Sequence, residues 1–68
     1  MNDTSETIGK QARSRRKKLG ITQKDLALTS GTGIRFIIDL EKGKSTCQLG
    51  KVLMVLNTLG LSLSLKER

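Results

Sequence analysis

The chain has 68 residues, with 13 Lys and Arg against 6 Asp and Glu, and its formal net charge is +7. One Cys and no His exclude a disulfide and a metal site built from such ligands, and the length leaves room for a single domain, 1–68. The excess of positive charge favours a polyanionic partner.

No stretch approaches the length of a membrane span, and the polar N-terminus lacks the pattern of a secretion signal. We therefore expect a cytoplasmic protein that does not bind membranes and needs no cofactor. In a reducing compartment Cys47 is expected to pack as a small apolar side chain.

The first predicted helix begins within residues 3–6 and runs to about Lys18. Ile8, Ala12 and Leu19 fall on one side of a helical wheel and predict a single apolar stripe. The basic residues between 13 and 18 form a charged face that favours long-range attraction to a polyanion.

Residues 20–44 contain two short helical patterns joined by a turn with two glycines, which is typical of a helix-turn-helix at about 22–42. Thr22 is expected to cap the first helix, with Asp25 as its capping-box partner. The second helix is predicted from Ile34 to about Lys42, followed by Gly43 in the left-handed conformation. One face of this second helix is apolar, and the other can meet DNA. The apolar face holds Phe36, Ile37 and Leu40. The face that can meet DNA holds Arg35, Ile38, Asp39 and Lys42.

Thr46 is the expected cap of a fourth helix that ends at Gly60. Met54 and Val55 lie off the centre of its apolar stripe, so they are expected to be partly exposed or to meet another subunit. The predicted stripe consists of Leu49, Val52, Leu53, Leu56 and Leu59.

After Gly60 the apolar period changes to two, because Leu61, Leu63 and Leu65 alternate with serines. This pattern predicts a half-buried strand at about 61–65. A lone strand has unpaired backbone groups, so a copy from a second subunit is the natural partner. The alternative is an apolar tail that packs on the fourth helix.

Three runs, LGITQKDLA, SGTGIRFIIDLEKGK and KVLMVLNTLGLSLSL, resemble the Xre-type helix-turn-helix family of phage repressors. The last run is similar to the HipB-like antitoxin branch. The resemblance implies an all-α, lambda-repressor-like bundle of four to five helices, with a short C-terminal β-strand that pairs across a homodimer.

The resemblance also implies roles for single residues. Gln23 would contact the DNA backbone or a base edge, and its alternative is a solvated surface position. Arg35 is the best base reader, since its guanidinium can bond guanine O6 and N7 together. Arg16 and Glu41 would form an architectural ion pair. The remaining implied DNA-binding residues are Gly33, Ile34, Ile38 and Asp39 on the recognition helix, and Lys42, Lys44 and Ser45 at phosphates.

We therefore predict a sequence-specific DNA-binding transcriptional repressor that binds a palindromic operator in double-stranded DNA as a homodimer. As a HipB-like antitoxin it would regulate its own promoter and bind a Hip-type kinase toxin or a three-protein toxin complex. Because the chain ends at Arg68, we expect any neutralisation to occur through its folded surface, through DNA-tethered complexes or through a third protein. The alternative is a phage-type or host regulator with no toxin partner.

Other classes fit poorly. A catalytic role is disfavoured because the chain has no His and the single Cys has no base. One aromatic residue, Phe36, offers little stacking surface for single-stranded RNA.

Overall fold

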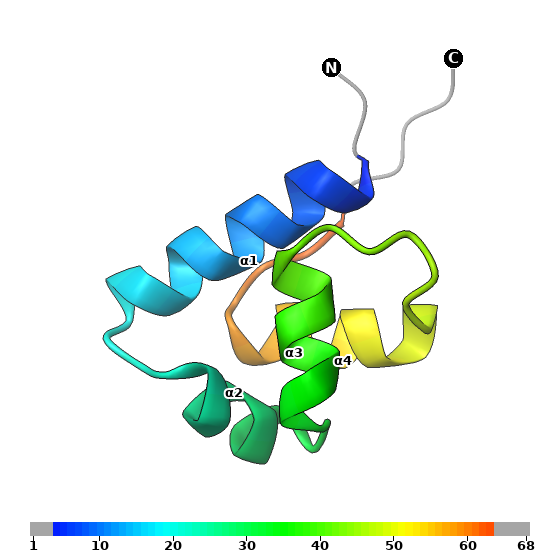
Figure 1. The fold of residues 1–68 in the computed structure, drawn as a ribbon. Helices are drawn as coiled ribbons and strands as arrows, with labels where there is room; N and C mark the ends of the chain where they lie inside the picture. Colours follow the sequence, from blue (N-terminus) through cyan, green and yellow to red (C-terminus); the bar gives the residue numbers. More distant parts are fainter. Residues whose placement is uncertain (1–3, 64–68) are drawn as a thin grey trace.

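The computed structural model describes residues 4–63, and within them the chain forms four α-helices and no strand. The long α1 crosses one side of the bundle, α2 and α3 stand at an angle to each other below it, and α4 packs against α2 (Figure 1). The helices are α1 (Ser5–Lys18), α2 (Gln23–Ser30), α3 (Ile34–Glu41) and α4 (Leu49–Thr58).

All four helices contribute to one core. Leu26 and Ile37 are fully buried at its centre, so the two helices of the helix-turn-helix are packed against each other there. The core residues are Ala12, Leu26, Ala27, Ile37, Leu40, Val52, Val55, Leu56 and Leu59.

The first helix begins at Thr4, whose hydroxyl accepts a hydrogen bond from the Thr7 N–H (3.1 Å). Ala12 is fully buried, as its place on the predicted stripe requires. Leu19, however, is 46% exposed, so its assignment to the apolar stripe was wrong. The helix ends at Lys18, and Arg16 takes the inward position of its last turn.

The start of α4 also differs from the prediction. Gln48 precedes its first turn, and the side chain of the expected cap, Thr46, is exposed in the turn before it. Neither residue makes a side-chain cap, so packing rather than capping determines where α4 begins.

The buried side of α4 is rotated relative to the predicted one. Val55 is fully buried, whereas Leu49 and Leu53 are 63% and 46% exposed. Val55 is therefore a core residue of its own chain and not an interface residue, while Met54 is 48% exposed as expected. Because α4 is apolar on most sides, the spacing of its apolar residues does not determine which side is buried. Packing against α2 determines it instead.

Beyond α4 the chain turns at Gly60 (φ 74°), and residues 61–63 run back along α1 (Figure 1). The Leu61 N–H donates to the Leu56 carbonyl (2.8 Å), and Leu61 and Leu63 pack half-buried against the core of the same chain. The strand predicted at 61–65 is thus not confirmed for residues 61–63. These residues are closer to the alternative of an apolar tail on the fourth helix, but they contact α1 as well as α4. Leu65 lies outside the described residues.

Candidate nucleic-acid interface

The helix-turn-helix has the local structure that its sequence predicts. Thr22 accepts a hydrogen bond from the Asp25 N–H, and the Asp25 carboxylate accepts one from the Thr22 N–H, both at 3.0 Å. The Thr22 N–H, and secondarily the Thr22 side chain, lower the pKa of Asp25. Gly31 ends α2 with a positive φ of 74°, and α3 follows after two residues.

One face of α3 is free of core contacts. Arg35 has an 80% exposed side chain and stands close to Ile34, which is 47% exposed. Ile38 and Asp39 are half-exposed on the same helix. Gly33 precedes α3 with an extended backbone and offers no side-chain cap. The face therefore presents a guanidinium and two apolar side chains, a combination that suits base edges in a major groove.

Asp39 lies between two cations on this face. Its carboxylate oxygens are 3.6 Å from Arg35 Nε and 3.6 Å from Lys44 Nζ. Both partners are well exposed, so the pairs contribute little to stability, but they bring Arg35 and Lys44 to the same side of α3. Lys42 and Ser45 are exposed at the end of α3 and in the following turn.

Arg16 and Glu41 form a buried ion pair between α1 and the last residue of α3. Arg16 donates to Glu41 through Nε (2.7 Å) and Nη2 (3.1 Å), and its Nη1 donates to the Ile21 carbonyl (2.9 Å). The side chains are only 10% and 4% exposed. The hydrogen bond to Glu41 raises the pKa of Arg16, which burial alone would lower.

Gln23 joins this pair. Its Nε2 donates to Glu41 Oε1 over 3.1 Å, so the first residue of α2 is tied to the last residue of α3. The sequence predicted a DNA contact for Gln23 but gave no sign of this contact, because it joins residues 18 apart and depends on the packing of three helices.

A groove of about 350 Å³ opens over the buried pair. Arg13 of α1 and Lys42, directly after α3, both line it, together with Gln23 and Ile38. From the sequence, Arg13 was predicted only to be part of the charged face of the first helix. Its position three residues before Arg16, and therefore on nearly the same side of α1, was the available signal.

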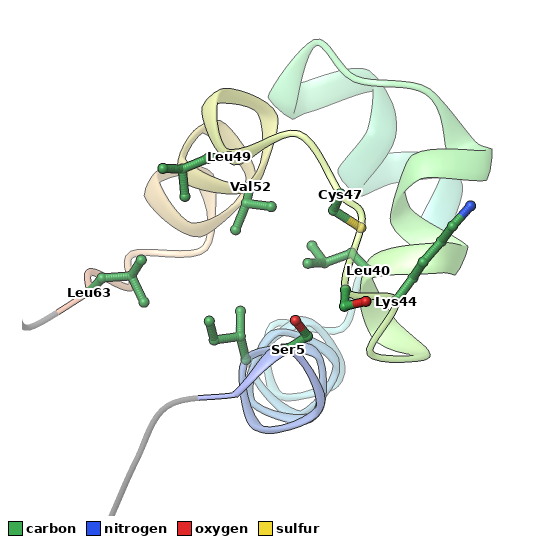
Figure 2. Close-up of a pocket in the computed structure, with 9 residues that line it drawn as sticks. Ser5, Leu40, Lys44, Cys47, Leu49, Val52 and Leu63 are labelled. Carbon is green, nitrogen blue, oxygen red and sulfur yellow. The ribbon is translucent and has the colours of Figure 1, made fainter.

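A separate apolar cavity of about 170 Å³ lies between the start of α1 and the start of α4. Leu40, Leu49, Val52 and Leu63 surround it, and half-buried Cys47 lies at its edge (Figure 2). Cys47 packs against the core, in agreement with its predicted role. Lys44 and Ser45, which follow α3, also line this cavity.

Among residues 4–63, no three His, Cys, Asp or Glu side chains come together as metal ligands would. In the same range, no helix combines the length and apolar character needed to cross a membrane.

The arrangement of a capped helix, a glycine turn and an exposed second helix defines a helix-turn-helix DNA-binding domain. Residues 13–66 match the helix-turn-helix family, and the chain belongs to this Xre-type family of DNA-binding regulators. The chain is 50% identical over 62 residues to an uncharacterized HTH-type transcriptional regulator, y4mF, of Sinorhizobium fredii (strain NBRC 101917 / NGR234). The matched part covers 91% of this chain and 82% of that relative. Neither match separates the HipB-like branch from the rest of the family.

Proposed function

We propose that this protein is a transcriptional repressor that binds a specific operator in double-stranded DNA by inserting α3 into the major groove. The exposed face of α3 carries the proposal, because Arg35 extends from it between apolar neighbours. Arg35 would read a guanine, and Ile34 and Ile38 would contact thymine methyl groups. Asp39 holds Arg35 on this face.

The phosphate contacts would come from the residues around the end of α3. Lys42, Lys44 and Ser45 are all exposed there. At the other end of α3, Gly33 has no side chain and would let the protein backbone come close to a DNA strand. These contacts carry no sequence information, but they set the register of α3 in the groove.

A second copy of the chain is the proposed partner for operator binding. Leu49 and Leu53 lie one turn apart on an exposed side of α4, and Met54 is exposed farther round the helix, which contains a single charged residue, Lys51. Two molecules of charge +7 repel each other most where their basic groups face, so an uncharged apolar face is the favoured place for contact. The Leu61 to Leu65 segment is the alternative contact, as paired strands.

Binding-site selection followed by footprinting tests operator binding. A dimer that neutralises roughly 6 to 8 phosphates gives a slope of about -5 to -7 for log K against log salt, and a slope shallower than about -2 contradicts the proposal. Arg35→Ala should cost about 1 to 3 kcal/mol and relax the preference at one base pair. Lys44→Ala should weaken all sequences alike and reduce the slope by about one.

Sedimentation velocity tests the dimer. Leu53→Glu places a charge on the exposed face of α4 and should give monomers, whereas Leu28→Glu, at a 74% exposed site on α2, is the matched control. If Leu53→Glu remains dimeric and Leu63→Asp gives folded monomers, the C-terminal segment is the interface instead.

The antitoxin role is a finer proposal that rests on the resemblance of residues 51–65 to the HipB-like branch. It requires a Hip-type kinase toxin that binds this protein and loses activity in the complex. Co-purification from the native cell, with identification of bound proteins and DNA, separates it from a regulator without a toxin. Recovery of operator DNA with no kinase supports the second role.

A further inference from the structure

The Glu41 carboxylate accepts three hydrogen bonds from two other helices. Two come from Arg16 on α1 at 2.7 and 3.1 Å, and one comes from Gln23 Nε2 on α2 at 3.1 Å. The Arg16 bonds join α1 to the end of α3. The Gln23 bond is a third hydrogen bond to the same carboxylate, and it fixes a side chain that lines the groove over the ion pair.

This bond determines which way the Gln23 amide is turned. An ionised carboxylate can only accept hydrogen bonds, so Gln23 must present its nitrogen, and not its oxygen, to Glu41. The second N–H of Nε2 is then left for a partner in the groove that Gln23 lines. A glutamine without such a bond would sample many rotamers and lose their entropy on binding.

The charges around the groove indicate the partner. Arg16 compensates the negative charge of Glu41 through two parallel bonds, so that charge does not repel an anion. Arg13 and Lys42 then leave the groove with an excess of positive charge. A DNA phosphodiester oxygen fits a groove that is lined by two cations and by an oriented amide.

We infer that Glu41 is a positioning residue for DNA binding: with Arg16, it holds the Gln23 amide so that its free N–H donates to a backbone phosphate between Arg13 and Lys42. This inference rests on the proposed function. It assigns Glu41 a role in affinity that is separate from its role in stability, and it adds Arg13 to the phosphate contacts.

A double-mutant cycle on operator affinity tests the inference. Glu41→Gln keeps the side-chain shape but can turn either end of its amide toward Gln23, and it should weaken binding roughly fivefold to tenfold, which corresponds to one ordinary hydrogen bond of about 1 kcal/mol. In a Gln23→Ala background the same change should have no further effect. Glu6→Gln, an exposed site on α1, controls for the change in net charge. Because Glu41→Gln also leaves the buried Arg16 without its counter-charge, affinities are compared at a temperature where circular dichroism shows all variants folded. Equal weakening by Glu41→Gln in both backgrounds, or none in either, overturns the inference.

A duplex with a neutral methylphosphonate at the phosphate nearest Gln23 identifies the ligand group. Gln23→Ala should weaken binding to the normal duplex and leave binding to the modified duplex unchanged. If Gln23→Ala weakens both duplexes equally, Gln23 contacts a base edge and the phosphate assignment is wrong.

Side-chain ¹⁵N relaxation of the wild-type protein without DNA provides a test that needs no variant. The Gln23 amide should be rigid on the picosecond to nanosecond timescale, while those of exposed Gln11 and Gln48 should be mobile. A mobile Gln23 amide contradicts the inference whatever the variants do. If the wild-type protein binds no duplex while Gln23 is rigid, the proposed function fails instead.

Discussion

The two helices of the helix-turn-helix have the same length, eight residues, but their positions are determined in different ways. Local residues set both ends of α2, through the Thr22 and Asp25 capping box and the left-handed Gly31. In contrast, α3 has no side-chain cap at its start, which is located by its buried face, although the left-handed Gly43 (φ 83°) ends it locally and Glu41 ties its last turn to α1. The start of α3, the proposed recognition helix, therefore depends on packing with distant parts of the chain, whereas both ends of α2 depend on neighbouring residues.

Loss of Arg16 should have the largest effect, because it removes the tertiary support of α3. Arg16→Met leaves Glu41 buried without its cation and should cost roughly 3 to 5 kcal/mol. A domain of this size has a total stability of about 3 to 10 kcal/mol. Urea unfolding followed by circular dichroism measures the change. Arg13→Met, at an exposed site on α1, is the control and should change stability little. Equal losses in the two variants would contradict the role of the ion pair.

A second way to disturb α3 from a distance is to fill the space at Gly9. A Cβ there would overlap the Leu40 carbonyl oxygen. It would also come within 3.2 Å of the backbone carbonyl oxygen of Glu41 and the backbone nitrogen of Gly43. Gly9→Ala should therefore cost about 1 to 3 kcal/mol, although alanine favours helices. Gly50→Ala in α4 meets no atom within 4 Å, so it should be stabilising by about 0.5 to 1 kcal/mol. Thermal unfolding should therefore show a lower melting temperature for Gly9→Ala and a higher one for Gly50→Ala. Opposite changes of this kind distinguish steric crowding from helix propensity.

The same contrast explains what could be predicted from the sequence. The cap at Thr22 and the turn glycines act over a few residues, so their pattern identified the helix-turn-helix correctly. The buried side of α4 could not be identified, because Leu49, Leu53 and Val55 are equally apolar and only packing distinguishes them. The bond from Gln23 to Glu41 was missed for the same reason, since it exists only after three helices assemble.

Removal of the α2 cap should have a smaller and more local effect. Thr22→Ala loses the hydroxyl that accepts from Asp25 and should cost about 1 kcal/mol. Amide hydrogen exchange should increase in the first turn of α2 and stay unchanged in α3. An equal increase throughout both helices would show that α2 is not independently stabilised by its cap.

The pH dependence of this cap has a definite sign. The Thr22 N–H lowers the pKa of Asp25 in the folded state, so ionised Asp25 contributes stability above its unfolded pKa of about 3.9. This contribution is lost as pH falls through the lower, folded pKa. Wild-type and Asp25→Asn urea midpoints should therefore differ most above about pH 4 and converge in stronger acid. A difference that grows in acid would contradict this linkage.

The smallest expected effect is a gain at the start of α3. Gly33 has an extended backbone (φ -93°, ψ 158°), and a Cβ there would meet no atom within 4 Å. Gly33→Ser supplies the missing cap without strain and should be stabilising by roughly 0.5 kcal/mol. Gly31→Ser is the control, because the positive φ of 74° at that position makes the substitution destabilising. If Gly33→Ser gives no gain in urea unfolding, packing against α1 and α2 alone determines where α3 begins, and a local cap cannot strengthen it.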